Sequence, residues 1–435
     1  MKKRNIVLVV DGGGRGAALV HKYSLSSHVS KIIAIPGNDL MQINSSIPVK
    51  TYQGIKTTSI KEILEVCKKE KVDLVDVAQD NAVATGLVDA LNKEGIKAVG
   101  PTKRAGQIEW DKAWAREFMK KNKIPSPKFK ICKSQKEGID FVKKHKASWF
   151  IKASGLAGGK GVIPARSTDE AVKAIKQMKK FGAAGKIYLL EEWLAGEEFS
   201  AFALSDGKDY QIVGFAQDHK RVNDGDLGEN TGGMGCVSSP LIINARVRRQ
   251  AEQIIRKTFV GLQKESRPYK GVLYLGGIVV KGEVYVIEFN ARWGDPEAEV
   301  ILPSIENDLY KVSQAIVSGD IKKIKIKLDK KVRVAVAGAS KGYPVNYSRV
   351  KGKKIFGIEE VQRIPNIRLY GAGIKKIGKN YFAQGGRLFY IVGEGKNILE
   401  ARKKAYKAMS AVSVEGNSLH YRTDIGWRDV ERLRK

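Results

Sequence analysis

The stretch 286–297 reads VIEFNARWGDPE and carries more weight for the fold than any other segment of the chain. Its first half has the composition of a strand, so Glu288 and Asn290 fall on one face, because side chains alternate along a strand. Their oxygens suit Mg²⁺, a hard ion that takes few protein ligands and completes its shell with phosphates. Arg292 continues the row and is suited to grip a carboxylate or a phosphate bidentately. The triplet alone is equally compatible with a polar surface row.

A glycine-rich loop lies upstream, where residues 152–162 read KASGLAGGKGV. Strand-like runs at 149–153 and 162–165 flank it. This context excludes a P-loop, because that motif connects a strand to a helix and ends in G-K-[ST]. A hairpin loop rich in N–H donors, with Lys152 and Lys160 beside it, suits a lid that closes over a triphosphate. A disordered glycine hairpin is the alternative.

A third segment, EEWLAGEE at 191–198, follows an apolar run at 187–190. A nucleotide base needs backbone hydrogen bonds beside an apolar wall, and ribose hydroxyls need a carboxylate acceptor. Trp193 and Leu194 with the neighbouring carboxylates can supply both, although this pattern is not specific by itself.

The segment QDHKR at 217–221 leads into a glycine-dense polar stretch at 223–235. Acidic and basic side chains there adjoin a loop too rich in glycine to serve as core. His219 could act as a general base. Alternatively, no such base is needed, because a deprotonated amine is already a good nucleophile, and Asp218 or Asp226 could position the amine. Both interpretations stay open at this point.

The first loop, DGGGRGA at 11–17, has the G-x-G-x-x-A spacing with which a turn before a helix cradles phosphate. A dinucleotide site also needs an acidic residue about 20 positions on, which holds ribose. The second strand instead ends in Pro36, Gly37 and Asn38, so NAD is disfavoured. Two interpretations of this loop remain, namely a binding site for a phosphate-bearing substrate and a plain tight turn.

The order of apolar runs predicts an α/β fold. Short strands that alternate with helices imply a parallel sheet, and we expect this over the first hundred residues. The strands are expected near 6–10, 32–35, 72–77 and 96–99, and the helices near 14–27, 59–70 and 82–93. Later patterns predict a helix through Met119, a helix at 245–264, strands at 272–280 and 283–289, and a helix at 397–412. The expected domains are 1–103, 104–328 and 329–435.

Composition limits the class of protein. The 435 residues suffice for about three domains, and 43% hydrophobic with 29% charged residues is globular. No run approaches the roughly 18 apolar residues of a membrane span. The first apolar segment stops at residue 10, which is too short for a signal-peptide core. Three cysteines without a C-x-x-C disfavour disulfides and zinc sites and predict a cytoplasmic location.

The net charge of +32 is the most unusual bulk property. A field of this sign attracts nucleic acid or an anionic membrane. The alternative is that lysines are spread over solvated helix faces. We favour the alternative and expect neither nucleic acid nor membrane as partner, because no basic block with interleaved aromatics stands out.

Taken together and in this order, the motifs resemble the phosphoribosylamine–glycine ligases, also called glycinamide ribonucleotide synthetases, of the ATP-grasp superfamily. The likeness runs nearly from end to end. Its most specific motif is R-F-G-D-P-E, which reads RWGDPE at 292–297. The other shared motifs are PGN at 36–38, GPT at 100–102, AGGKG at 157–161, TGGMG at 231–235, GGR at 385–387 and YRTDIG at 421–426.

The resemblance implies an ATP-grasp fold with a lid subdomain at about 126–195, an N-terminal parallel-sheet domain and a small C-terminal α+β domain. It implies a ligase that joins glycine to 5-phosphoribosylamine through glycyl phosphate, giving glycinamide ribonucleotide, ADP and phosphate, in the second step of de novo purine synthesis. The implied cofactors are ATP and Mg²⁺ or Mn²⁺, the partners are these small molecules, and a monomer is expected.

The resemblance also assigns roles to residues. Glu288 and Asn290 would bind the metal, Lys152 and Lys160 the phosphates, Glu191 the adenine edge and Glu198 the ribose. The nucleotide site would further include Lys112, Gly158, Gly159, Gly161, Glu192 and Leu194. Catalysis would depend on Arg292, Asp218, Lys220 and Asp295. The other substrates would contact Gly13, Gly14, Arg15, Asp80, Asp218, Arg292, Gly294 and Asp295.

Departures from the family cluster in the first domain. The family usually has G-S-G-G-R-E-H-A after the first strand, where this chain has DGGGRGAA at 11–18. It has G-P-E where residues 78–80 read AQD, and a glutamine where Glu299 stands. These loops lie on the side expected to receive phosphoribosylamine. A ligase with a different amine acceptor, or an inactive basic paralogue that binds nucleic acid, therefore remain as alternatives.

Overall fold

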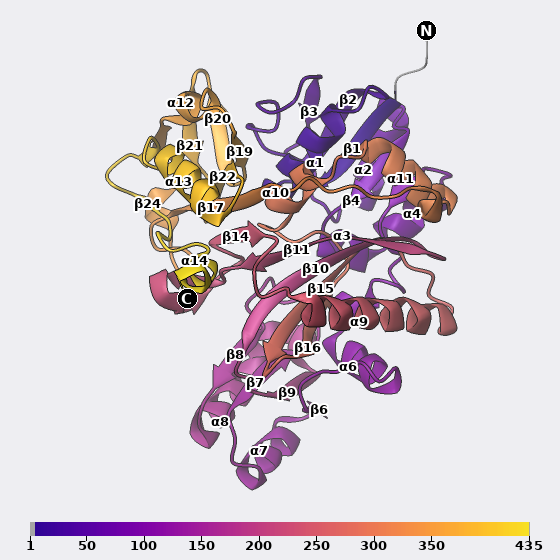
Figure 1. Ribbon diagram of the computed structural model, residues 1–435. Helices are drawn as coiled ribbons and strands as arrows, with labels where there is room; N and C mark the ends of the chain where they lie inside the picture. Colours follow the sequence, from indigo (N-terminus) through magenta and orange to yellow (C-terminus); the bar gives the residue numbers. More distant parts are fainter. Residues whose placement is uncertain (1–4, 435) are drawn as a thin grey trace.

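Five parallel strands build the N-terminal domain, in the order β3-β2-β1-β4-β5 (Figure 1). The computed structural model describes residues 5–434, so the expected start of this domain at residues 1–4 lies outside the described residues. All pairs in the sheet are parallel, which confirms the expectation. The strands are β1 (Asn5–Asp11), β2 (Val29–Pro36), β3 (Val49–Thr51), β4 (Leu74–Val77) and β5 (Ala98–Val99), and the helices are α1 (Gly14–Ser24), α2 (Ile60–Glu70), α3 (Asp80–Thr85) and α4 (Leu87–Lys93).

Local backbone chemistry divides two of the expected helices. The helix expected at 82–93 is α3 and α4, because Gly86 adopts φ +90° and ends the first of them. The helix expected through Met119 is α5 (Gln107–Trp110) and α6 (Lys112–Lys121). Asp111 separates these two, since its side chain accepts a hydrogen bond from the Trp114 N–H and caps α6. The cap places Lys112 at the first position of α6.

The segment expected to form the lid subdomain contains a separate four-stranded antiparallel sheet, in the order β6-β9-β7-β8. It has its own cluster of buried apolar side chains, which includes Val142, Ile151 and Ile175. The glycine-rich loop connects β7 to β8, so the predicted hairpin is confirmed at its predicted bounds. The elements are β6 (Phe129–Cys132), α7 (Gln135–Lys144), β7 (Trp149–Ala153), β8 (Val162–Ala165), α8 (Thr168–Gln177) and β9 (Tyr188–Glu192).

A nine-stranded sheet forms the centre of the molecule, in the order β16-β15-β10-β11-β14-β17-β22-β19, with β24 paired to β17. It continues across the expected boundary at 328, because β14 pairs with β17. The strands are β10 (Glu197–Asp206), β11 (Tyr210–Asp218), β14 (Gly235–Ser238), β15 (Lys270–Val280), β16 (Glu283–Asn290), β17 (Val332–Ser340), β19 (Ile367–Gly371), β22 (Arg387–Gly395) and β24 (Leu419–His420).

The remaining elements surround this sheet. Figure 1 shows α9 running along the central sheet and α11 lying beside the N-terminal domain. A further four-stranded sheet belongs to the C-terminal part, in the order β20-β21-β18-β23. These elements are β12 (Arg221–Asn223), β13 (Leu227–Asn230), α9 (Ala245–Lys264), α10 (Ala298–Ile301), α11 (Leu309–Ser318), β18 (Lys354–Phe356), α12 (Ile358–Gln362), β20 (Ile374–Ile377), β21 (Asn380–Ala383), α13 (Ile398–Met409), β23 (Ser413–Val414) and α14 (Trp427–Arg434).

The loop after β16 ties the three parts of the chain together. Asp295 in this loop pairs with Arg387 of β22 at 3.1 Å, and Tyr390 also donates a hydrogen bond to Asp295. From the N-terminal domain, Arg15 of α1 donates through Nη1 to the Trp293 carbonyl at 3.0 Å. The motif that decides the fold therefore lies where the three domains meet.

Glu299 lies in α10 behind this junction. It is fully buried, and among the described residues neither carboxyl oxygen has a hydrogen-bond partner. Burial raises the pKa of Glu299 well above its usual range and Asp295 adds to this, although Arg387 and Arg15 oppose it. A buried carboxyl without a partner is costly in its charged form, so Glu299 is held neutral.

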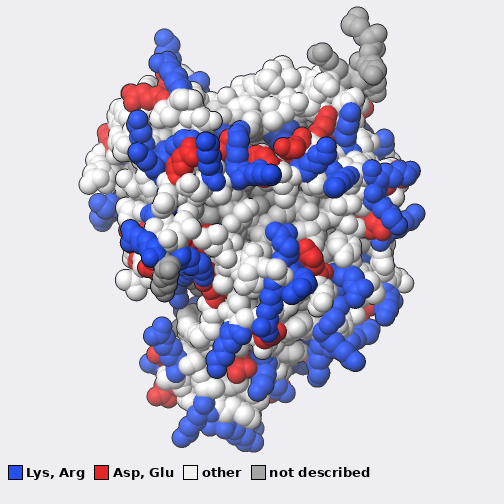
Figure 2. Space-filling model, in the orientation of Figure 1, with Lys and Arg blue, Asp and Glu red and all other residues white. Residues whose placement is uncertain are grey.

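The surface is basic over a wide area. Figure 2 shows Lys and Arg side chains distributed over much of the visible face, with Asp and Glu between them. Among the described helices, none combines the length and the apolar character that crossing a bilayer requires.

Gly14 offers a test of how tightly the domains meet. A Cβ at this position would lie 2.2 Å from Tyr390 Cε2 and 2.3 Å from Glu299 Oε1. We therefore expect Gly14→Ala to lower the free energy of unfolding by about 1–3 kcal/mol, the usual cost of overpacking. Gly54→Ala is the control, because a Cβ there meets nothing within 4 Å. Urea denaturation measures both, and equal stabilities for the two variants would contradict the tight junction.

Glu299 gives a prediction about pH. Because its pKa is raised in the folded protein, the folded state holds a proton that the unfolded state loses above about pH 4.5. The contribution to stability is complete below that pH and is lost as the pH rises toward the folded pKa. Glu299→Gln removes this titration, so its stability relative to the wild type should increase between pH 5 and pH 8, by at most about 1.4 kcal/mol per pH unit.

Chemical denaturation of both proteins across this pH range measures the difference. The exposed Glu117→Gln on α6 is the control for the loss of a surface carboxylate. A stability difference for Glu299→Gln that stays constant or shrinks with rising pH would refute the neutral carboxyl.

Candidate active site

Cationic side chains from distant parts of the sequence converge on Glu288 of β16. Burial acts to raise the pKa of Glu288, but Lys220, Lys152, Lys112 and Arg292 outweigh it and bring the pKa below its usual value. These residues come from the end of β11, the lid strand β7, the start of α6 and the loop after β16. The fold thus gathers an ionised carboxylate and four cations at the base of the lid.

Glu288 and Asn290 fit a divalent cation. Both lie on β16, and Asn290 is 8% exposed. Within residues 5–434, no hydrogen bond or ion pair occupies the Glu288 carboxylate, whereas Asn290 Oδ1 accepts a hydrogen bond from Arg292 at 3.5 Å. In the same range no group of three or more His, Cys, Asp or Glu side chains could hold a metal. A site with two oxygen ligands suits Mg²⁺, which relies on substrate phosphates for further ligands.

Lys152 is held in place by a buried ion-pair triad that the sequence did not reveal. Glu191 pairs with Lys152 at 2.6 Å and accepts two hydrogen bonds from Arg116, at 2.7 and 2.8 Å. Arg116 also donates to the carbonyls of Val286 and Ile287. Burial acts to raise the pKa of Glu191, yet Arg116 and Lys152 outweigh it and lower this pKa to about 2. The triad therefore links the lid, α6 and β16.

This finding bears on the expected role of Glu191 at the adenine edge. Its carboxylate is already engaged by two cations, and its backbone lies in the ladder between β6 and β7. Arg116 was missed because it sits within an ordinary amphipathic helix. Its only sequence signal is a cation on the buried face of α6.

The rest of the lid lies nearer to solvent. Trp193 stacks on Phe150, with ring centroids 4.4 Å apart, and so forms an apolar wall beside the half-buried Glu192 and Leu194. Lys160 is exposed in the loop between β7 and β8 and forms no ion pair within the described residues. Next to it Gly158 and Gly159 have φ values of +57° and +76°, which glycine adopts without strain.

Lys220 and Asp218 lie at the end of β11. Lys220 pairs with Glu198 at 2.6 Å, and a small crevice beside them is also lined by Ser200 and Tyr274. Asp218 Oδ1 is buried without a partner among the described residues. Burial raises the pKa of Asp218 well above its usual range, and Glu297 adds to this effect. Asp218 therefore has a high proton affinity, as a group that takes a proton from an amine requires.

Arg292 is anchored by Glu109, a residue that the sequence patterns did not indicate. The guanidinium pairs with Glu109 Oε1 at 3.0 Å, and Glu109 Oε2 accepts the Ala291 N–H at 2.7 Å. Burial raises the pKa of Glu109 to about 6, although Arg292 opposes this. Asp80 from the N-terminal domain adds to the negative potential around both groups. The structure thus brings Asp80 and Arg292 together, as the sequence led us to expect.

The glycine loop after β1 has a compact arrangement of its own. Arg15 pairs with Asp11 at 2.5 Å and is 4% exposed, so its guanidinium is engaged within the loop. A Cβ at Gly16 would lie 2.8 Å from Asp11 Cβ, so Asp11 fills the space that a side chain at position 16 would need. Asp11 and Gly16 are thus a linked departure from the family pattern. A Cβ at Gly13 would lie 2.9 Å from a carboxylate oxygen of Asp295, and a Cβ at Gly294 would lie 2.1 Å from one of Glu297.

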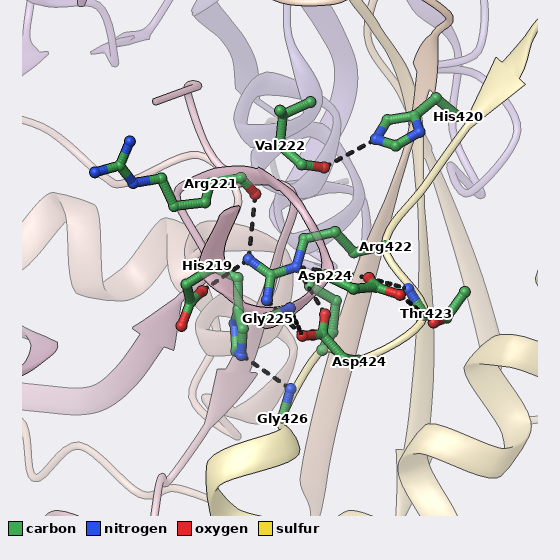
Figure 3. A network of polar contacts seen from close by, with 12 residues as sticks. His219, Arg221, Val222, Asp224, Gly225, His420, Arg422, Thr423, Asp424 and Gly426 are labelled. Atoms are coloured by element: carbon green, nitrogen blue, oxygen red, sulfur yellow. Dashed lines mark hydrogen bonds and ion pairs between the residues drawn. The ribbon is translucent and has the colours of Figure 1, made fainter. Parts of the chain in front are cut away.

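His219 faces away from this site. It is 1% exposed, and its Nε2 accepts a hydrogen bond from the Gly426 N–H at 3.0 Å (Figure 3). Burial lowers the pKa of His219 to about 3, with Arg422 and Arg428 contributing. This neutral ring therefore holds the C-terminal segment through its acceptor nitrogen. Because that nitrogen is occupied, the general-base interpretation gains no support.

A separate cavity lies elsewhere. It has a volume of about 410 Å³, is bordered by β11 and α9, and is lined by Tyr210, Phe215, Arg248 and Glu252 among others. It contains none of the expected site residues. The candidate site is therefore identified by converging charges and not by this cavity.

Comparisons with known proteins agree with this arrangement. Three family models match consecutive segments, namely the phosphoribosylglycinamide synthetase N domain at 5–109, its ATP-grasp (A) domain at 110–298 and its C domain at 333–428. Phosphoribosylamine–glycine ligase of Caldanaerobacter subterraneus is 38% identical over 96% of this chain and 99% of its own length. The chain also matches the trifunctional purine biosynthetic protein adenosine-3 of Bos taurus at 37% identity, but spans only 42% of that protein.

Solved structures show the same fold. Phosphoribosylamine–glycine ligase of Thermotoga maritima has a TM-score of 0.81 at 29% identity, over 97% of this chain and 100% of that one. The biotin carboxylase domain of Hydrogenobacter thermophilus 2-oxoglutarate carboxylase, at 15% identity, shares the fold alone, with a TM-score of 0.74. With a full-length relative at 38% identity and family models along nearly the whole chain, the sequence-based recognition is confirmed, and the chain belongs to the phosphoribosylglycinamide synthetase family.

Proposed function

We propose that the chain joins glycine to 5-phosphoribosylamine at the expense of ATP, giving glycinamide ribonucleotide, ADP and phosphate. Membership of the family supports this reaction. The observation that carries it is the free, ionised Glu288 surrounded by Lys112, Lys152 and Lys220. Such a group of charges is what a bound nucleotide triphosphate with its metal requires.

The nucleotide would lie between the lid and the central sheet, with Mg²⁺ or Mn²⁺ on Glu288 and Asn290. The ATP-grasp neighbour from Hydrogenobacter thermophilus was solved with MgADP, which supports this assignment. The metal would neutralise charge on the terminal phosphates. Lys152 would contact the phosphates from β7, and Lys160 would reach them when the loop of Gly158, Gly159 and Gly161 closes. Lys112, Glu191, Glu192, Leu194 and Glu198 would contact the remainder of the nucleotide.

In the first step, a carboxylate oxygen of glycine attacks the γ-phosphorus in line, and ADP leaves. Arg292 would hold the glycine carboxylate, because its guanidinium has donors beyond those given to Glu109, Trp293 and Asn290. Lys220 would stabilise the charge on the transferring group. The product, glycyl phosphate, must meet the amine before it meets water, which is the reason for a closing lid.

In the second step, the amine nitrogen of phosphoribosylamine attacks the carbonyl carbon of glycyl phosphate, and phosphate leaves. Asp218 in its ionised form would take the proton from the amine, and its raised proton affinity favours this transfer. Asp295 would keep the loop of Gly294 against the N-terminal domain, where Gly13, Gly14, Arg15 and Asp80 would contact the phosphoribosyl group. We further propose that the enzyme acts as a monomer, since one chain supplies every element named here. We also propose that it acts in the cytoplasm.

A different amine acceptor is the second candidate. The linked change at Asp11 and Gly16 and the neutral Glu299 alter the buried support of the loops that would receive the amine. The ATP and metal site would remain the same in that case. The nucleic-acid interpretation gains nothing from the spread of charge in Figure 2.

A coupled assay tests the proposed reaction. Purified protein with ATP, Mg²⁺, glycine and freshly generated phosphoribosylamine should release ADP and form glycinamide ribonucleotide. ADP release should need both co-substrates, because the acyl phosphate turns over only when the amine arrives. If other amines support ADP release and phosphoribosylamine does not, the second candidate replaces the first.

Glu288 tests the metal site. Glu288→Ala should lower kcat by at least about 10²-fold, because the metal loses its only anionic protein ligand on β16. Its melting temperature should not fall, since the carboxylate makes no contact that the fold needs. Glu283→Ala on the same strand is the control, because this exposed side chain pairs with Arg246 at the surface. Normal turnover by Glu288→Ala would remove this residue from the metal site.

A further inference from the structure

The C-terminal segment 420–428 lies along the hairpin formed by β12 and β13. His420 Nε2 donates to the Val222 carbonyl at 2.8 Å, and the Thr423 N–H donates to Asp224 at 2.8 Å. In the opposite direction, the Gly225 N–H donates to Asp424 at 2.8 Å. These contacts join segments that are about two hundred positions apart in the chain, as Figure 3 shows from close by.

Arg422 is the centre of this contact. It is fully buried and donates to both oxygens of Asp424 at 2.7 Å, to Asp226 at 2.9 Å and to the Arg221 carbonyl at 3.2 Å. Arg428 donates to the second oxygen of Asp226. The planar guanidinium can serve all of these acceptors at once, which an ammonium cannot do.

The hairpin has little else to hold it. All of β13 is exposed, with Leu227 at 66%, and Val222 is the only buried side chain of either strand. A two-stranded hairpin is only marginally stable without a packed face. Its position therefore depends on polar contacts with the C-terminal segment.

The hairpin begins directly after Lys220. His219 faces the C-terminal segment, while Lys220 faces Glu198 and the crevice, as alternation along an extended backbone requires. The carbonyl of Lys220 accepts hydrogen bonds from the N–H and the hydroxyl of Thr231, both at 2.8 Å, on the return side of the hairpin. Any shift of the hairpin is thus passed to the Lys220 backbone.

We propose that Arg422 is a positioning residue, which fixes the β12–β13 hairpin through Asp226 and the Arg221 carbonyl and so places Lys220 in the active site. The predicted effect of Arg422 on turnover rests on the proposed ligase reaction. Its predicted effect on the position of the hairpin does not. The C-terminal domain thereby contributes to catalysis without touching a substrate.

The kinetic test replaces Arg422 by lysine, which keeps the charge but loses the fork. We expect Arg422→Lys to lower kcat by about 10²-fold, the usual cost of misplacing a catalytic group by about 1 Å, with a smaller change in KM for ATP. The matched control is Arg333→Lys. Arg333 is equally buried and pairs with Asp329 and Glu394, but it does not touch the hairpin.

Asp226→Asn is a second variant, which removes one acceptor of Arg422 at almost constant volume and leaves Arg422 itself in place. It should lower kcat in the same direction. If Arg333→Lys lowers kcat as much as Arg422→Lys, the effect is a general loss of stability and the proposal fails. Unchanged turnover in both Arg422→Lys and Asp226→Asn overturns it as well.

A structural readout separates this proposal from the ligase reaction. Chymotrypsin should cut after the exposed Leu227 faster in Arg422→Lys and in Asp226→Asn than in the wild type or in Arg333→Lys, as intact mass spectrometry would show. If the wild type forms no glycinamide ribonucleotide, the proposed reaction fails, yet this comparison still decides on the hairpin. Equal cutting rates in all four proteins overturn the positioning role.

Discussion

The ion pair between Asp295 and Arg387 is the contact on which the rest of the site depends. Arg387 also donates to the carbonyls of Asp295, Gly232 and Gly233, so one guanidinium joins the loop after β16 to the loop before β14. On the other side of the same loop, Arg15 reaches the Trp293 carbonyl from the N-terminal domain. The position of Arg292 relative to all three domains follows from these contacts.

Electrostatic balance explains why this site holds its charges in the ionised state. Burial penalises every charged group here, and a neighbour of opposite sign compensates Glu191 and Glu288 but not Asp218, whose pKa stays raised. Lys152 and Arg116 share Glu191, Glu198 takes Lys220, and only Glu288 faces cations without a direct partner. The lowered pKa of Glu288 therefore supports the proposal that the metal and the phosphates bind here.

The sequence predicted the parallel sheet, the β7–β8 hairpin and α9 at or close to their observed bounds, because strong periodicity and glycine punctuation are local properties. It also predicted the ATP-grasp class and the family. It did not predict β3, Arg116 or Glu109, because their roles arise from contacts between distant segments. The assigned roles of the site residues stay predictions. The structure adds that Arg15 and the Glu191 carboxylate are engaged by other residues of this chain.

Four arginines, three of them buried and Arg387 half-buried, repeat one arrangement at the borders of the site. Arg15, Arg116, Arg387 and Arg422 each pair with a carboxylate and also donate to a main-chain carbonyl of another segment. Buried ion pairs contribute little net stability, because desolvation offsets the attraction. We infer that these arginines set positions instead, since the planar guanidinium fixes direction as well as distance. The geometry of the site thus depends on oriented polar contacts, which apolar packing alone would not specify.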